Sequence, residues 1–431
     1  MSNSKKGMTT NREKLIVVFT HTNYMLISGG TEKFVREYSE LIRNQGAADL
    51  AIFPLAHRGK HSSYYVGILY KGSFLGIYNA DEIERVISWH IKKYQLVLSC
   101  IVIQHLKNSN LNVVCRVVEH FNVPTYLFIH DFYSICCNTR LIDDNGNHCG
   151  YATPNSDKCE TCSLKEQALE HFKTICAFYE KIDVYISKIF VPSTFVRDKI
   201  AAIYSQWINR IEVRPHIILS EIRTMNPCQG KIKLAYVGAQ IKDKGYDKWT
   251  LLVKQLSDRC PDGYEFFYFG YGTDTLPEVK NIYVAESTGQ KMEALLKQYD
   301  IDAALFWSKC GETYSYVYYE MSLAGVFVIT NSESGNVAYE VSKNKNGIAF
   351  TDYEEALKWF SNTKEVKKQI NDYRKNGSYR PMYKHNNEEI YLPDASKTEH
   401  CCECKNKRNN ILTFLYYAKH IAFHKGERKI V

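Results

Sequence analysis

Two glutamates, Glu312 and Glu320, are the residues of this chain whose spacing most directly suggests chemistry. The segment between them suits the start of a helix, and small residues end it at Ala324 and Gly325. Eight helical positions span roughly 12 Å, about the length that separates the sugar from the ribose in a nucleotide-sugar. Glu312 could act in the loop before the helix beside backbone N–H groups, and Glu320 could accept hydrogen bonds from ribose hydroxyls. The alternative is two solvated glutamates, which are common on helices and usually structural.

A pair of glycines, Gly29 and Gly30, stands between a strand-like run and the helix-forming stretch KFVREYSELIRNQG. Glycines let a backbone approach a ligand closely, and a helix N-terminus presents unpaired N–H groups to an anion. We therefore predict a phosphate-binding turn here, with an ordinary tight turn as the alternative.

The elements that must position these residues follow a regular order. Hydrophobic runs of strand length alternate with amphipathic stretches of helix length, which is typical of βαβ units around a parallel sheet and predicts an α/β fold. The predicted strands are 14–20, 48–55, 96–103, 125–130 and 189–192, then 232–237, 264–269, 282–284, 303–307, 326–330 and 347–350.

A pause in this order divides the chain of 431 residues, which is longer than one hydrophobic core usually supports. Residues 214–230 contain two prolines and a glycine without strand alternation, as an interdomain linker does. We expect a Rossmann-like domain over 1–215, a second over 231–375, and a polar linker with a basic C-terminal helix over 376–431.

Several further motifs occur in an informative order. They are the Gly29-Gly30 loop, His130-Asp131 after a strand, Gly238 and Lys244-Gly245, the run FGYG at 269–272, and the Glu312 to Glu320 segment. In these motifs the chain resembles retaining glycosyltransferases of the GT-B fold and is most similar to glycosyltransferase family 4, up to about residue 340. The resemblance implies two Rossmann-like domains with a central cleft and a C-terminal closing helix.

The resemblance also implies roles for individual residues. The catalytic residues would be Glu312 at the donor sugar, Lys244 at the diphosphate and His130 facing the sugar from the first domain. A lysine at the phosphates stabilises charge that grows as the nucleotide diphosphate leaves. The implied donor-binding residues are Gly29, Gly30, Gly238, Lys244, Gly272, Glu312, Tyr314, Ser315, Tyr316 and Glu320.

The reaction implied by the resemblance is transfer of a hexosyl group, with retention, from a nucleotide-diphosphate-sugar to a glycan or lipid-linked acceptor. Such a reaction serves surface polysaccharide biosynthesis and requires no cofactor for catalysis. The family pattern has an arginine where this chain has Ala239. Lys242 or a residue of the first domain could substitute for it. The alternative is a catalytically inactive GT-B subunit that binds a partner glycosyltransferase or a glycan.

Composition and charge bound where such a protein would work. The first residues are polar and basic, and apolar runs stop well short of the roughly 20 residues that span a bilayer, so we expect a cytoplasmic protein. The net charge is +8, with many basic residues near the C-terminus. That tail could contact the inner face of a membrane peripherally or pack back on the fold. It contains no nucleic-acid-binding module.

The fourteen cysteines suggest a second kind of site. Cys136, Cys149, Cys159 and Cys162 lie in one loop-rich stretch that ends in a C-x-x-C of metal-ligand spacing, and could bind a structural zinc ion. Reduced, free thiols are the alternative. A second cluster lies at His400, Cys401, Cys402 and Cys404. We interpret Asp300 and Asp302 as structural rather than as metal ligands.

Overall fold

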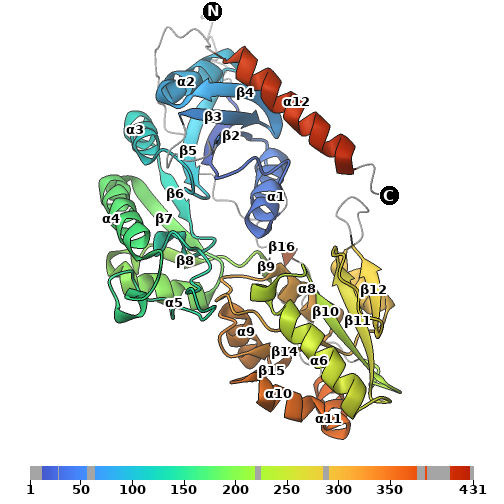
Figure 1. Ribbon diagram of the computed structural model, residues 1–431. Coiled ribbons are helices and arrows are strands. Elements are labelled where there is room, and N and C mark those ends of the chain that lie inside the picture. Colours follow the sequence, from blue (N-terminus) through green and yellow to red (C-terminus); the bar gives the residue numbers. More distant parts are fainter. Residues whose placement is uncertain are drawn as a thin grey trace, which may run out of the picture.

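The computed structural model describes residues 12–27, 29–55, 64–218, 225–284, 291–375, 384–385 and 408–427. Two sheets organise this part of the chain, one built before residue 214 and one after residue 231 (Figure 1). Helices lie against both, so the predicted α/β class with two Rossmann-like domains is confirmed.

The first sheet has eight strands within the described residues, in the order β4-β3-β2-β1-β5-β6-β7-β8. They are β1 (Lys14–Phe19), β2 (Ala48–Pro54), β3 (Tyr65–Tyr70), β4 (Ser73–Asn79), β5 (Val97–Ile103), β6 (Thr125–Phe128), β7 (Ile186–Val191) and β8 (Ile211–Val213). Alternate residues of β1 enter different cores: Leu15 and Val17 join one, Ile16 and Val18 the other. This alternation is the period of a strand buried on both faces.

Five helices of the first domain supply the other halves of these cores. They are α1 (Gly30–Asn44), α2 (Ile83–Lys93), α3 (Leu111–Phe121), α4 (Lys165–Ile182) and α5 (Thr194–Ile203). Phe34 and Val35 of α1 pack on the same face as Ile16, whereas Val117 of α3 packs on the face of Leu15.

An antiparallel hairpin, β3–β4, extends the first sheet beside β2 and was absent from the sequence prediction. Its two-residue turn is Lys71-Gly72, where both residues have positive φ, at 50° and 77°. Such a turn matches the twist of the two strands it joins. A Lys-Gly pair between two apolar, aromatic runs was the signal that could have revealed it.

The second sheet is parallel throughout its six strands in the described chain, in the order β12-β11-β10-β13-β14-β15. The strands are β10 (Ile232–Val237), β11 (Tyr264–Gly270), β12 (Val279–Tyr283), β13 (Ala303–Phe306), β14 (Phe327–Asn331) and β15 (Gly347–Phe350). The helices are α6 (Tyr246–Arg259), α7 (Met292–Gln298), α8 (Tyr316–Ala324), α9 (Asn336–Asn344), α10 (Tyr353–Phe360) and α11 (Thr363–Lys375). The strand order reverses between β10 and β13, because later strands are added on the other side of β10, and Rossmann folds bind ligands at such a point.

The remaining elements are short or join the two parts of the chain. Within the predicted linker, β9 (Ile217–Ile218) pairs with β16 (Lys384–His385). The C-terminal helix α12 (Asn410–Glu427) returns to the first domain and packs beside β4, where Tyr417 Oη donates to Phe74 O at 3.0 Å (Figure 1). Turns of 3-10 helix are η1 (Ala80–Glu82), η2 (Phe132–Ser134), η3 (Asp157–Cys159), η4 (Asp183–Tyr185), η5 (Ser205–Trp207) and η6 (Lys242–Lys244).

None of the helices in the described ranges is long and apolar enough to cross a membrane.

Candidate functional site

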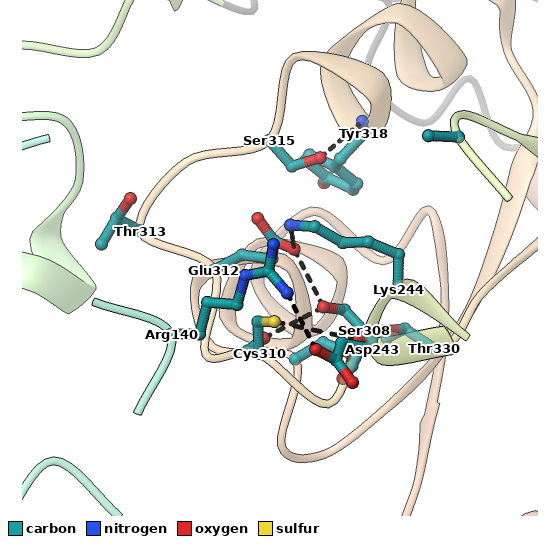
Figure 2. Close-up of polar contacts among 12 residues, drawn as sticks. Arg140, Asp243, Lys244, Ser308, Cys310, Glu312, Thr313, Ser315, Tyr318 and Thr330 are labelled. Atoms are coloured by element: carbon teal, nitrogen blue, oxygen red, sulfur yellow. Dashed lines mark hydrogen bonds and ion pairs between the residues drawn. The ribbon is translucent and has the colours of Figure 1, made fainter. Parts of the chain in front are cut away.

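An ion pair lies at the edge of the second sheet where the strand order reverses, between β10 and β13. Lys244 ends the turn after β10, and Glu312 lies in the loop after β13, yet Lys244 Nζ is 2.5 Å from Glu312 Oε1 (Figure 2). Ser308 Oγ donates to the same carboxylate oxygen at 2.9 Å. Burial acts to lower the pKa of Lys244, but the Glu312 carboxylate outweighs it and the pKa is raised. Lys244 therefore remains a cation.

Glycine at 245 is what allows this lysine to stand so close to the β13 loop. Gly245 has φ +89°, and a Cβ there would collide with the backbone carbonyl of Trp307. A residue with a side chain would be both strained and obstructed. The Lys-Gly motif is thus required by the packing of one strand end on its neighbour.

The backbone of Glu312 is held by residues at the start of α9, in the same domain. Asn336 N, at the start of α9, donates to Glu312 O at 2.8 Å, and Gly335, with φ +64°, packs against the same peptide. The Glu312 side chain is only 10% exposed, so its carboxylate has a defined orientation.

Glu320 does not lie free on its helix but meets the first domain. Its Oε1 is 3.2 Å from Nζ of Lys33 on α1, and that ammonium also lies 4.3 Å from the ring centre of Tyr316. Burial raises the pKa of Glu320, and Lys33 opposes the rise. Both predicted glutamates are therefore buried in polar contacts, which the solvated alternative did not anticipate.

Residues between the two glutamates join the domains and begin helix α8. Thr313 Oγ1 donates to His130 O at 2.5 Å, and Ser193 Oγ donates to Thr313 O at 3.0 Å. Ser315 caps α8 by accepting from Tyr318 N at 3.3 Å. Tyr314 stacks 4.4 Å from Tyr319 and lies 4.2 Å from the ring of His216.

The predicted glycines differ in their surroundings. Gly238 has φ +124° and open space around it, and a Cβ at Gly272 would collide with the side chain of Gln240. Gly30 has room for a Cβ, whereas the Glu32 carboxylate lies over Gly29. Hydrogen bonds from His21 and Thr22 outweigh burial and lower the pKa of Glu32 to about 2. An ionised carboxylate thus lies at the turn where we predicted a phosphate, and the described geometry gives that prediction no support.

His130 lies at the end of β6, at the junction with the Thr313 loop. Its Nε2 donates to Gln104 Oε1 at 2.7 Å. Burial, helped by the neighbouring His105, lowers the pKa of His130 to about 3, so the imidazole is neutral near pH 7. It can offer a hydrogen bond but no charge.

Sequence reasoning missed several polar residues beside His130. His105 accepts from Lys107 N on Nδ1 at 3.0 Å, so its Nε2 carries the proton that it donates to Asp131 Oδ2 at 3.1 Å. His21 lies 3.1 Å from Glu32, and its ring centre is 4.3 Å from that of His105. His21, His105 and His130 each follow a strand by two residues. That position alone was a signal, because the carboxyl ends of parallel strands meet at one edge.

One further contact joins the domains at the Lys244 site. Arg140, in the loop between η2 and α4, places Nη1 2.9 Å from Asp243 Oδ2 (Figure 2). Sequence reasoning did not single out either residue.

The cysteines of the predicted zinc site lie in the same loop as Arg140. Cys136, Cys149, Cys159 and Cys162 have free thiols. Across the part of the chain that the structure describes, no three His, Cys, Asp or Glu side chains are grouped to hold a metal ion. The zinc prediction therefore gains no support here. The second cluster, at 400–404, lies outside the described residues.

Comparisons with known proteins bear on the fold. No family profile matches the chain, and no curated protein matches it in sequence. A glycosyltransferase from Rickettsia africae ESF-5 superposes with a TM-score of 0.50 and 12% identity, over 85% of this chain and 94% of that one. Anabaena Alr3699/HepE in complex with UDP-glucose has a TM-score of 0.48 and 12% sequence identity, over 84% of this chain and 93% of that one. The pneumococcal O-GlcNAc transferase GtfA, in complex with UDP and GlcNAc, has a TM-score of 0.49 and 10% sequence identity, over 85% of this chain and 96% of that one. At such identities the likeness concerns the fold alone, and that fold is the GT-B architecture.

Proposed function

We propose that this chain is a glycosyltransferase that takes a sugar from a nucleotide-diphosphate-sugar bound by the second domain. The observation that carries the proposal is the Lys244–Glu312 pair at the reversal point between β10 and β13. A cation and an oriented carboxylate at that point can bind, respectively, the diphosphate and the hydroxyls of a sugar. Two proteins of similar fold bind related ligands: Anabaena HepE is in complex with UDP-glucose, and pneumococcal GtfA with UDP and GlcNAc.

Each charged residue has a defined task in this mechanism. Lys244 stabilises the negative charge that grows on the leaving diphosphate. Glu312, oriented by Ser308, accepts hydrogen bonds from the donor sugar. Glu320 accepts hydrogen bonds from the ribose, which requires the ribose to share or replace the contact with Lys33.

The acceptor binds, in this proposal, at the carboxyl edge of the first sheet. Neutral His130 faces the reaction from that side without adding positive charge beside the donor. The ionised Glu32 would repel a phosphate there and suits the hydroxyl groups of a sugar instead.

The finer assignments rest on the family resemblance. They are retention of configuration, transfer of a hexosyl group, a glycan or lipid-linked acceptor, surface polysaccharide biosynthesis, a cytoplasmic location with peripheral membrane contact, and independence from a catalytic metal.

A catalytically inactive subunit is the second candidate, and Ala239 is the observation that favours it. A transfer assay with Glu312→Gln separates the two. An enzyme loses activity when this carboxylate is neutralised, whereas an inactive subunit has no turnover to lose.

Donor binding is tested by thermal-shift titration of the purified protein with UDP, GDP, TDP, ADP and CMP, because a ligand of the native state raises the melting temperature. We expect one diphosphate to raise it and Glu320→Ala to reduce the effect. Glu354→Ala, on the exposed start of α10, is the control and should leave the shift unchanged. No shift with any nucleotide at millimolar concentration would contradict the proposal.

A further inference from the structure

Arg140 belongs to the first domain, but its guanidinium lies among the charged residues of the second (Figure 2). Its side chain is 56% exposed, and the ion pair with Asp243 is its one polar side-chain contact among the described residues. A guanidinium carries five N–H donors, so most of its hydrogen-bonding capacity remains available to a ligand. The charge of Arg140 also reaches Lys244 and Cys310, since it acts to lower the pKa of both.

The charges around Arg140 are balanced before any ligand binds. Lys244 is paired with Glu312, and Arg140 is paired with Asp243, so the four side chains carry no net charge. A diphosphate needs additional positive charge or the release of one of these cations. Lys244 is held at 2.5 Å by a carboxylate that is 10% exposed, whereas Asp243 is 33% exposed. Arg140 is therefore the cation that can turn to a ligand at lower cost.

The loop that carries Arg140 is held by hydrogen bonds within itself and by contact with the second domain. Asn138 Nδ2 donates to Ile142 O at 2.8 Å, and Asn138 Oδ1 accepts from Arg140 N at 3.2 Å. Further along, His148 and Tyr151 pack so closely on Gly311 that a Cβ there would collide with both side chains. The loop is thus held against the residue that precedes Glu312.

The backbone of Asp243, the ion-pair partner of Arg140, is also held in place. Its backbone oxygen accepts from Lys309 N at 2.9 Å, which ties the turn η6 to the loop after β13. The position after Gly238 is Ala239, which has no charge to contribute. Lys242, three residues further, is exposed and is the second lysine of turn η6 beside Lys244.

We infer that Arg140 is a phosphate-binding residue of the donor site, supplied to the second domain by the first. The inference rests on the proposed function and names a further residue of the same site. When a nucleoside diphosphate binds, the guanidinium leaves Asp243 and donates to the phosphate oxygens, opposite Lys244. Binding of the donor then requires both domains, because each supplies one cation.

The test is the dissociation constant of the diphosphate that stabilises the wild-type protein most, compared with that of the corresponding monophosphate. Arg140→Ala should weaken diphosphate binding about tenfold or more, the value of a charge-assisted hydrogen bond, and monophosphate binding much less. Arg140→Lys, which keeps the charge but not the two-pronged geometry, should fall between. Arg116→Ala is the control, because Arg116 on α3 pairs with Asp81 and Glu84 instead.

A second variant separates phosphate binding from a simple latch between domains. Asp243→Asn removes the carboxylate that competes with the phosphate for Arg140, so diphosphate binding should be unchanged or tighter. If Asp243→Asn weakens binding as much as Arg140→Ala does, the ion pair is a latch and the inference is wrong. It is equally wrong if Lys242→Ala, and not Arg140→Ala, causes the loss. Should the wild-type protein bind no diphosphate, the proposed function falls as well.

Discussion

The carboxyl edges of the two sheets carry different kinds of polar group. At the first, His130 is buried and neutral, and the ionised Glu32 is already paired with His21. At the second, Lys244 and Arg140 are cations whose side chains are 40% and 56% exposed. The same α/β scaffold therefore presents one edge suited to an uncharged, hydroxyl-rich molecule and one suited to an anion. The difference arises from loop residues, since both edges are built from buried apolar strands.

The largest effect that would test this difference is on catalysis. Lys244→Ala removes the cation that, in the proposed function, stabilises the leaving diphosphate, and should lower the transfer rate about 100-fold to 1,000-fold. Lys107→Ala removes an exposed lysine from the edge of the first sheet and should change the rate less than about threefold. Steady-state kinetics with the two variants measure both values. Equal losses would mean that the two edges do not differ in the way proposed.

The next effect concerns backbone conformation and stability. Gly245→Ala places a Cβ against the Trp307 carbonyl at positive φ and should destabilise the protein by about 3 kcal/mol. Gly30→Ala places its Cβ in ordinary van der Waals contact with the Tyr316 ring, 3.9 Å away, and should cost less than about 1 kcal/mol. Denaturant unfolding of each variant gives the comparison. A tolerated Gly245→Ala would contradict the account of the Lys-Gly motif.

Histidines of the first edge predict a pH dependence. Burial lowers the pKa of His216 well below its ordinary value, and its Nδ1 makes no hydrogen bond to the described residues. Below about pH 6.5 the unfolded chain therefore binds a proton that the folded chain does not, and stability falls as the pH falls. His216→Phe removes this proton uptake and should stabilise the protein at pH 5 by about 2 kcal/mol relative to its effect at pH 7.5.

His21, which pairs with Glu32, supplies the control for that measurement. His21→Phe deprives the Glu32 carboxylate of a partner and should destabilise the protein by about 1 kcal/mol or more. Melting temperatures at the two pH values distinguish the variants. If His216→Phe and His21→Phe changed the stability at pH 5 in the same direction, the lack of a hydrogen-bond partner would not be what distinguishes His216.

The smallest effect on stability comes from the ion pair that joins the two domains, Lys33–Glu320. Lys33→Met leaves Glu320 without its ammonium partner and should cost about 1 kcal/mol at pH 7.5. The loss should shrink toward pH 4, because the raised pKa of Glu320 favours its protonation there. Lys248→Met, which removes a lysine 4.7 Å from the Tyr353 ring, should cost less at either pH. A loss independent of pH would show that Lys33 acts through packing.

Local sequence pattern determined most of the scaffold. Apolar runs such as 14–20 and 232–237 correspond to β1 and β10, because a strand buried on both faces must be apolar throughout. The same reasoning placed Glu312 before a helix and Glu320 within it, as α8 shows. The β3–β4 hairpin was missed because its strands pair antiparallel, outside the alternating order.

Only the tertiary structure decided which residues share the site. Lys244 and Glu312 are 68 positions apart, and Arg140 and Asp243 are 103 apart, so no local spacing connects them. They meet because parallel strands deliver their following loops to one edge, and because the two domains bring such edges together. Arg140 lies in an irregular loop without periodicity. Its position depends on the contact of His148 and Tyr151 with Gly311, a residue of the second domain that only the folded chain brings to this loop.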